Sequence, residues 1–389
     1  MSDNNVSAKK ERQIGLDIIR TLAIIFVFIT HGITYKGYLD QNVLTNEWTL
    51  VLVIRFIALC CVPLFLLLTG YLNNKKEISL KYYKAIIPLL LSYFLISFIE
   101  LFGFNLFTTA PISNVTSISG DTIISGESIS QIGNTAILYT PERVSQIRWP
   151  EHLVKIFNFT ENSYAWYFEM YIGLFLLIPF LNILWDNLKS KKERVILIIT
   201  CSFLSLIPKI LEGFRIYNLN GDGNMDWLDV LPDYWKIVHP LAYFYIGKYI
   251  KEYKPNINLI IRLVLFIIAV AIPVLSCYFV SKNANGYAWY MFNGFGTITN
   301  AFVAVTVFLL FYNINKKIPL IAQVISQIAI CSFEMYLFSS IFDKIYYTIF
   351  AEKSLIFVVF MTLISTYICA RIWIWIRDLI FKKLLKIYW

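Results

Sequence analysis

Ten apolar runs, each close to the length that crosses a lipid bilayer, dominate this sequence. A bilayer-spanning helix needs about 20 predominantly apolar residues. Runs of this kind occupy residues 13–35, 48–72, 84–106, 164–185, 194–212, 235–251, 257–280, 289–313, 319–348 and 355–377. The chain is 58% hydrophobic and only 15% charged, which excludes the surface of an ordinary soluble protein. We therefore predict an all-α polytopic membrane protein with about ten transmembrane helices.

Short clusters of Lys and Arg separate the apolar runs and give the chain its net charge of +9. One cluster precedes the first run, and others follow the second, fourth, sixth, eighth and tenth, so all fall on one side of the predicted membrane. Because basic connections favour the cytoplasmic side, we expect both termini to be cytoplasmic. A nucleic-acid-binding domain instead gathers its basic residues on one face, so we expect no nucleic acid as a partner. The cysteines lack metal-ligand spacing, and we expect no metal.

The longest connection, at about residues 107–163, lies on the extracytoplasmic side. Its first half is rich in Ser, Thr, Ile and Gly, and its second half is aromatic and charged. A connection of this length usually has a function of its own, and we expect its second half to fold over the outer end of the helical bundle. The whole chain, residues 1–389, is predicted to form a single transmembrane domain.

The first apolar run carries three polar residues at membrane depth: Asp17, Arg20 and His31. On a helix, Arg20 and His31 lie about 16 Å apart along the axis and about 20° apart around it, so they share one face. Asp17 lies one turn before Arg20, within reach of an ion pair. His31 suits a general base, because imidazole titrates near neutral pH. A hydrogen bond from His31 to a neighbouring backbone carbonyl is an equally good explanation.

Other polar residues fall within the predicted helices at two levels. The outer half of the bundle is expected to gather His31, Arg55, Glu100, Glu169, His239 and Asp343. The inner side is expected to carry Asp17, Arg20, Lys81 and Lys84, with Glu334 between the levels. Interhelical ion pairs would also explain Arg55, Glu169 and Glu334. Glu100 and Asp343 are expected to snorkel to the interface. The two levels predict a reaction or a route that spans the membrane.

Six segments resemble those of the membrane-bound acyltransferase family 3 and occur in the same order. They are GLDIIRTLAIIFVFITH, RFIALCCVPLFLLLTGYLNNKK, KYYKAIIPLLLSY, WYFEMYIGLFLLIPFLN, YFYIGKYI and SFEMYLFSSIF. In the first segment, Arg20 and His31 match the essential Arg and His of the family. In the third, Lys81 and Lys84 stand where many members have Arg. Lysine keeps the charge of arginine but lacks its bidentate fork.

The resemblance implies an integral-membrane O-acyltransferase of a bacterial cytoplasmic membrane. Such an enzyme moves an acyl group, here expected to be acetyl, from cytoplasmic acetyl-CoA or another acyl-CoA to a hydroxyl group of a surface or exported polysaccharide or lipid-linked glycan. A succinyl donor and a homo-oligomeric state stay open. At this stage a flippase for lipid-linked glycans and a polysaccharide polymerase also remain alternatives. A flippase should show inverted repeats, and a polymerase should depend on loop residues such as Arg143 and Arg148.

With this function as the hypothesis, individual residues can be given roles. His31 would be the general base or a transient acyl carrier, and Glu169 or Asp17 would orient it. About 21 Å of helix separates Asp17 from His31, which favours Glu169. The phosphates of CoA would contact Lys81, Lys84 and Arg20. Substrate contacts are expected from Arg55, Tyr71, Trp166 and Glu334.

Overall fold

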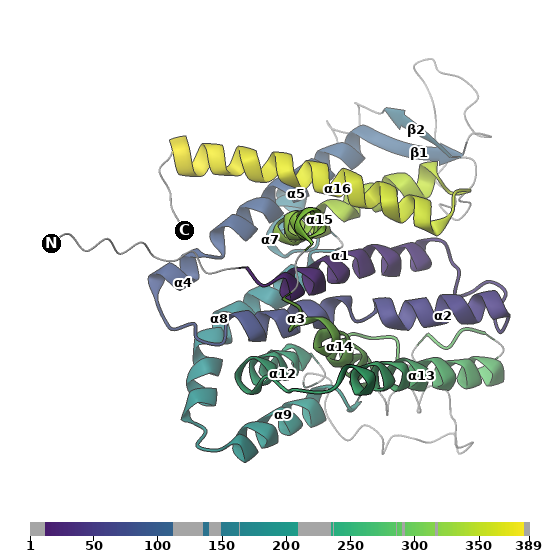
Figure 1. Ribbon diagram of the computed structural model, residues 1–389. Helices are drawn as coiled ribbons and strands as arrows, with labels where there is room; N and C mark the ends of the chain where they lie inside the picture. The colour runs from purple at the N-terminus through teal and green to yellow at the C-terminus, as the bar shows by residue number, and fades with distance from the viewer. Residues whose placement is uncertain are drawn as a thin grey trace.

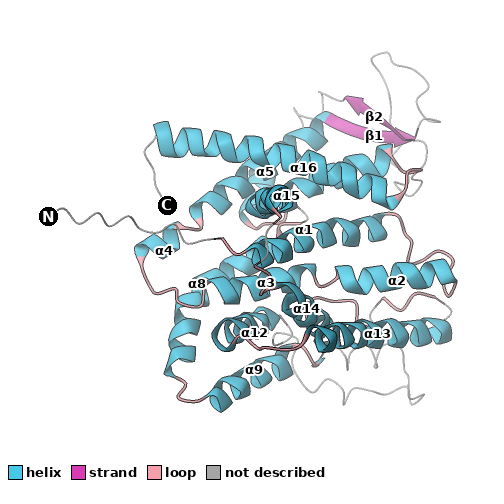
Figure 2. Cartoon of the chain, in the orientation of Figure 1, coloured by secondary structure: helices cyan, strands magenta, loops and turns pink. Residues whose placement is uncertain are grey.

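The computed structural model describes residues 12–111, 135–139, 149–162, 164–208, 235, 237–284, 286–289, 292–315 and 318–384. Nearly all of these residues are helical (Figures 1 and 2). The helices are α1 (Ile14–Tyr35), α2 (Asn46–Ala58), α3 (Cys61–Leu72), α4 (Leu80–Lys84), α5 (Ile87–Leu106), α7 (Trp149–Phe157), α8 (Trp166–Asn187), α9 (Lys191–Ser205), α12 (His239–Tyr253), α13 (Leu259–Ala284), α14 (Ile298–Phe311), α15 (Pro319–Ile349) and α16 (Leu355–Asp378), which continues into a π-helical segment, Leu379–Leu384.

Seven of the described helical segments are long and apolar enough to cross a membrane. They are Ile14–Tyr35, Asn46–Leu72, Leu80–Phe102, Trp166–Asn187, Leu259–Ala284, Pro319–Ile349 and Leu355–Lys383. Helices α9 and α12, with 15 residues each, and α14, with 14, are shorter. At a rise of 1.5 Å per residue they fall short of a bilayer core of about 30 Å. The molecule is thus a polytopic membrane protein, and its described residues contain seven helical segments long and apolar enough to span, which does not confirm the predicted ten.

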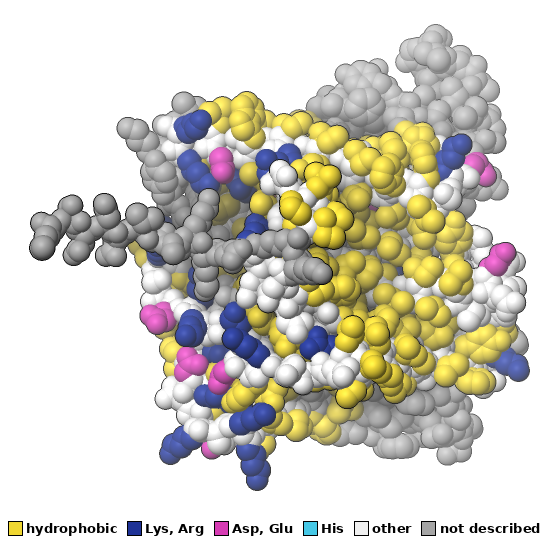
Figure 3. Space-filling view, in the orientation of Figure 1, with side chains coloured by type: hydrophobic (Ala, Val, Ile, Leu, Met, Phe, Trp, Pro, Cys, Tyr) yellow, Lys and Arg dark blue, Asp and Glu magenta, His cyan; other side chains and the backbone are white. Residues whose placement is uncertain are grey.

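The described surface has the layered character of a membrane protein. Hydrophobic side chains cover the middle of the face shown in Figure 3, and charged side chains gather toward its two ends. Helices α1 and α16 run in opposite directions, so α1 begins and α16 ends toward the same side of the molecule (Figure 1). Lys and Arg side chains are most frequent at that side in this view (Figure 3). We refer to it below as the basic end, and to the opposite side as the outer end.

Serine and threonine residues fix where several helices begin. The side chains of Thr45, Ser79, Ser190, Thr297 and Ser354 each accept a hydrogen bond from the backbone N–H three residues further along. These N-caps satisfy backbone donors that a helix cannot satisfy itself. The second apolar run is interrupted between α2 and α3, where Asn300 donates a 2.9 Å hydrogen bond to the carbonyl oxygen of Leu59. The bundle thereby satisfies a carbonyl group at this break.

Helix α1 lies in the middle of the bundle, in contact with α2, α3, α14, α15 and α16 (Figure 1). Helices α3 and α12 approach each other closely. A Cβ atom on Gly70 would lie 2.0 Å from the carbonyl oxygen of Phe244, and one on Gly247 would lie 2.1 Å from that of Leu67. Only glycine permits this approach. Gly70 lies in the second of the six segments quoted above, near the end of α3, where it allows these two helices to pack closely.

The long outer connection begins and ends with ordered elements. Strand β1 (Phe107–Pro111) pairs with β2 (Thr135–Tyr139) in an antiparallel sheet, and Phe107 faces Tyr139 in the register. This sheet departs from the all-helical prediction. Helix α7 follows and packs against α5, where Tyr93 donates a 2.6 Å hydrogen bond to the carbonyl oxygen of Ile156. The chain then turns into the bundle, since Asn162 is buried. This turn brings the end of the connection to the polar face of α1.

Candidate active site

His31 lies near the end of α1 and contacts a buried carboxylate. Its Nδ1 atom is 3.1 Å from Oδ2 of Asp343 in α15. The hydroxyl group of Tyr164 donates a 2.9 Å hydrogen bond to the same oxygen. The rings of His31 and Tyr164 lie 4.1 Å apart between centroids, and the side chain of Asp343 is 0% exposed. Two buried neighbours therefore fix the position of the imidazole.

This geometry leaves one nitrogen of His31 available for chemistry. An ionised carboxylate accepts a hydrogen bond only from a protonated Nδ1, which leaves the lone pair on Nε2. Among the described residues, none is hydrogen-bonded to Nε2, and the side chain is 23% exposed. A carboxylate placed in this way also stabilises the imidazolium that forms when Nε2 takes up a proton. His31 and Asp343 thus have the geometry of a general base and the group that orients it.

The carboxylate beside His31 is not the one that the sequence favoured. Glu169 is exposed on α8, and its carboxylate has no hydrogen bond or ion pair within the part of the chain that the structure describes. Asp343 was expected to snorkel to the interface but is fully buried. Glu100 is also buried, at 3% exposure, because it pairs with Lys344 at 2.6 Å. Both snorkelling predictions are therefore wrong, since each carboxylate has a partner inside the bundle.

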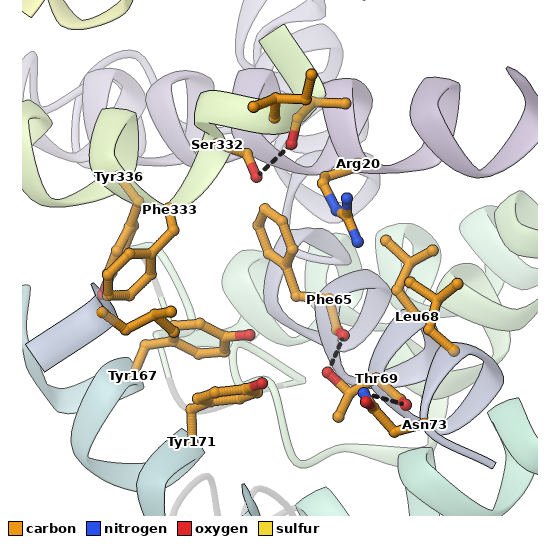
Figure 4. A pocket seen from close by; sticks show the side chains of 14 residues that line it. Arg20, Phe65, Leu68, Thr69, Asn73, Tyr167, Tyr171, Ser332, Phe333 and Tyr336 are labelled. Carbon is orange, nitrogen blue, oxygen red and sulfur yellow. Dashed lines mark hydrogen bonds between the residues drawn. The ribbon is translucent and has the colours of Figure 1, made fainter. Parts of the chain in front are cut away.

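Arg20 faces a central cavity of about 230 Å³. In Figure 4 the side chains of Arg20, Tyr167 and Tyr171 converge on this space from α1 and α8. The other lining residues are Phe65, Leu68, Thr69, Leu72, Asn73, Leu89, Ala329, Ile330, Ser332, Phe333 and Tyr336. No hydrogen bond or ion pair joins the Arg20 guanidinium to another described residue. Arg20 is thus a cation that faces a largely apolar cavity.

The predicted ion pair between Asp17 and Arg20 does not form. Asp17 is buried, and its Oδ2 atom is 2.6 Å from Nε of Arg12. The same oxygen accepts a 2.7 Å hydrogen bond from Ser326 of α15. Arg12 lies just before α1, and its side chain extends along the first turn of the helix to Asp17. This pairing leaves the guanidinium of Arg20 available to a ligand.

Two further cavities lead from the basic end of the molecule to Arg20. One, of about 550 Å³, shares Arg20, Leu72 and Ile330 with the central cavity and is also lined by Tyr71. The next, of about 820 Å³, shares Lys251 and Asn74 with the 550 Å³ cavity. It is lined by five cations, Lys75, Lys76, Arg194, Lys248 and Lys251, and by three acids, Glu77, Asp186 and Glu252. We call it the basic cavity. Adjoining cavities thus connect a cationic surface to Arg20.

Lys81 and Lys84, the cations expected to contact phosphate, lie elsewhere. Both are exposed on α4. Neither is among the described residues that line the basic cavity or the two cavities beyond it. In the lining, Lys251 places its Nζ atom 4.5 Å from the ring centroid of Tyr71. Tyr71, predicted to contact substrate, therefore lies toward the basic end, in the lining of the 550 Å³ cavity.

A fourth cavity, of about 670 Å³, lies at the outer end, and its lining on α1 begins one helical turn beyond His31. Its lining includes Tyr35, one turn after His31, and Tyr347, one turn after Asp343, whose rings stack 5.1 Å apart. A Cβ atom on Gly32 would lie 2.2 Å from the Tyr347 hydroxyl, so that hydroxyl touches the α1 backbone next to His31. The other lining residues are Lys36, Gly37, Tyr38, Gln41, Ala351, Glu352, Lys353 and Ser354. We call this space the outer cavity.

Arg55 and Trp166, two of the predicted substrate contacts, lie in different settings. Arg55 is buried and donates hydrogen bonds to the carbonyl oxygen of Thr30, at 2.9 Å, and to Oγ1 of Thr34, at 3.1 Å. It therefore ties α2 to the turn of α1 that holds His31. Trp166 is 39% exposed and stacks on Phe295 at 5.3 Å.

Glu334, the last of the predicted contacts, belongs to a buried ion pair. Its Oε1 atom is 2.9 Å from NH1 of Arg377 in α16 and 3.2 Å from the hydroxyl of Ser92 in α5. Glu334 therefore joins three helices, in agreement with its interpretation as an interhelical ion-pair member. Arg143 and Arg148, on which a polymerase was expected to depend, lie outside the described residues.

From the sequence, Tyr164 was not identified as a site residue, and Asp343 was placed at the membrane interface instead of beside His31. Asp343 carried one usable signal, because it is an acidic residue within an apolar run at the same expected depth as His31. Tyr164 carried none, since it stands in a run of aromatic residues at the end of the long connection. Among the described residues, no group of three or more His, Cys, Asp or Glu side chains is placed to hold a metal ion.

Comparison with known protein families assigns the chain. Residues 13–374 match the model of acyltransferase family 3, which is described as an acyltransferase domain. Neither the curated proteins nor the solved structures contain a significant match to the chain. The family match spans nearly the whole sequence and includes Arg20, His31, Tyr164 and Asp343. The chain therefore belongs to acyltransferase family 3 and is a membrane acyltransferase.

Proposed function

We propose that this membrane acyltransferase moves an acetyl group from acetyl-CoA at the basic end to a glycan hydroxyl at the outer end. The basic end faces the cytoplasm in this proposal, and the membrane is a bacterial cytoplasmic membrane. The observation that supports it is the placement of cavities at both ends of α1. Three adjoining cavities reach Arg20 from the basic end, and another lies at the outer end, one helical turn beyond His31.

The donor would enter through the basic cavity. Five cations against three carboxylates give its lining a positive balance, which suits the phosphates of CoA. Beyond it, the apolar and tyrosine-lined central cavity suits the pantetheine arm of the donor. Arg20 lies where the central cavity meets the 550 Å³ cavity that adjoins the basic cavity, and its guanidinium offers up to five donors to a phosphate or amide oxygen. An extended pantetheine arm can span the roughly 16 Å of helix from Arg20 to His31.

The acceptor would occupy the outer cavity. This cavity combines the rings of Tyr35 and Tyr347 with the charged side chains of Lys36, Glu352 and Lys353. Aromatic surface with a few polar groups is typical of sites for small polar molecules, and a sugar can stack on tyrosine while it hydrogen-bonds to charged groups. An acceptor hydroxyl in this cavity would lie on the same side of the bundle as His31.

The chemistry follows from the available nitrogen of His31. Nε2 would take the proton of the acceptor hydroxyl as the hydroxyl oxygen attacks the thioester carbonyl carbon. The C–S bond would then break, and the thiolate of CoA would take the proton from the imidazolium, which Asp343 stabilises meanwhile. An acyl-histidine route would use the same nitrogen as a nucleophile and the same carboxylate.

The test compares two histidine variants in membrane vesicles that contain the full-length protein. His31→Ala should lower transfer from labelled acetyl-CoA to the host glycan fraction by about 10²-fold or more, the usual contribution of a general base. His152→Ala is the matched control, because His152 pairs with Glu161 in the outer connection at 3.0 Å and does not line the cavities described above. Both variants are compared at equal amounts of protein in the membrane.

Normal glycan acylation in the His31→Ala vesicles would overturn the proposal. Loss of glycan export or of chain length, with acylation unchanged, would favour a flippase or a polymerase instead. Succinyl-CoA in a parallel reaction identifies the acyl group, because the donor that labels the glycan faster is the physiological type.

A further inference from the structure

Tyr164 stands between the central cavity and the outer cavity. On the outer side, its hydroxyl lies 3.3 Å from the hydroxyl of Tyr35, which lines the outer cavity. On the inner side, its carbonyl oxygen accepts a hydrogen bond from Tyr336, which lines the central cavity. The rings of Tyr164 and Tyr336 stack with centroids 6.4 Å apart. Tyr164 is only 8% exposed, so it is packed between a residue that lines the outer cavity and one that lines the central cavity.

A buried polar network holds Tyr164 in this place. Oδ1 of Asn162 accepts a 2.9 Å hydrogen bond from the backbone N–H of Tyr164, and its Nδ2 donates to Ser340 at 2.9 Å. Ser340 also lies 3.0 Å from Oε2 of Glu100, which pairs with Lys344 as described above. Asn162 and Glu100 are 1% and 3% exposed. A satisfied network of this kind fixes one side-chain arrangement in a bundle.

The hydroxyl of Tyr164 also contacts the carboxylate that orients His31. It donates to Oδ2 of Asp343, the oxygen that also contacts Nδ1 of His31. The other carboxylate oxygen, Oδ1, is buried and has no hydrogen-bond partner among the described residues. Tyr164 therefore supplies one of the two contacts that hold this carboxylate toward His31.

We infer that Tyr164 is a positioning residue that keeps Asp343 against His31 and closes the route for water from the outer cavity to the donor thioester. The inference rests on the proposed function. A thioester beside a general base is open to hydrolysis, in which a water oxygen attacks the carbonyl carbon, the C–S bond breaks and the thiolate takes up a proton through His31. The products are acetate and free CoA. Water exclusion by the protein suppresses such side reactions.

Three variants of the full-length protein separate the two tasks of Tyr164. Tyr164→Phe keeps the ring but removes the hydrogen bond to the Asp343 carboxylate, so the rate of acetyl transfer should fall about tenfold. The ratio of released CoA to transferred acetyl should stay the same. Tyr164→Ala removes the ring as well, so acetyl-CoA alone should release CoA severalfold faster relative to transfer than in the unmodified protein. Tyr278→Ala is the matched control, since Tyr278 is a half-buried tyrosine of α13 that packs on Trp48 and should leave both rates unchanged.

The measurement is made in liposomes with acetyl-CoA, with and without the host glycan fraction, and quantifies free CoA and labelled glycan. If Tyr164→Ala does not accumulate in the membrane, Tyr164→Leu replaces it with the same expectation. An unmodified protein that neither releases CoA nor labels glycan from acetyl-CoA or succinyl-CoA would overturn the proposed function. An active Tyr164→Ala or Tyr164→Leu variant whose ratio of released CoA to transferred acetyl equals that of the unmodified protein would overturn the water barrier alone. Full transfer by Tyr164→Phe would overturn the positioning role.

Discussion

Arg20 and His31, two polar residues of α1, lie in opposite kinds of environment. His31 is held by Asp343 and Tyr164, both of which are buried. Arg20 faces two adjoining cavities and has no hydrogen bond or ion pair to another described residue. A side chain fixed by its surroundings is preorganised for chemistry, whereas a cation that faces a cavity can bind a ligand. One helix thus carries a chemical position toward the outer end and a binding position toward the basic end.

Removal of the negative charge of Asp343, which orients His31, should lower activity more than any other substitution in this comparison. Asp343→Asn keeps the shape of the side chain but no longer stabilises an imidazolium, so kcat should fall about 10³-fold with little change in the KM for acetyl-CoA. Initial rates of transfer in vesicles measure both constants. Asp40→Asn is the control, because Asp40 is an exposed carboxylate that accepts a hydrogen bond from Trp289 at 2.9 Å. A normal kcat in Asp343→Asn would show that His31 needs no orienting carboxylate.

A substitution at the binding position should show the complementary pattern. Arg20→Gln removes charge-assisted contacts to the donor, so the KM for acetyl-CoA should rise about tenfold or more, and kcat should change less. Arg20→Lys keeps the charge without the fork and should lose less affinity. Donor titrations of the three proteins at fixed glycan give these values. A fall in kcat at constant KM would place Arg20 in the chemical step and remove the distinction between the two positions.

Hydropathy was sufficient to predict where the helices lie. All ten apolar runs contain helices, because a chain in lipid must satisfy its backbone polar groups within each segment. The number of spans could not be predicted, because a short helix packed inside a bundle is as apolar as a spanning one. Helix α14 is the clearest case, with 14 residues that include the buried polar side chains of Asn300 and Thr306. Its length, rather than its hydropathy, separates it from the spanning helices.

The site could be predicted along one helix but not between helices. Helical geometry predicts that Arg20 and His31 share one face, and the structure places Arg20 at a cavity and His31 against Asp343. The partner of His31 lies 312 residues away in the sequence, a separation that no spacing rule connects. The predicted ion pair between Asp17 and Arg20 was wrong for a different reason. Arg12 and Arg20 are both close enough in the sequence to reach Asp17, and spacing alone does not favour Arg12. Tertiary contacts decide such choices.

The smallest effect should separate two sets of cations near the basic end. Lys251 lines the basic cavity and the 550 Å³ cavity that leads to Arg20, so Lys251→Gln should raise the KM for acetyl-CoA severalfold through the loss of one charge-assisted contact. Lys81 is exposed on α4, where an interaction with a bound anion is screened by solvent. Lys81→Gln and Lys84→Gln should therefore change that KM by less than Lys251→Gln, and raised salt should reduce the difference. The reverse order would mean that the donor phosphates lie over α4 and that the cavity series toward Arg20 is not the donor path.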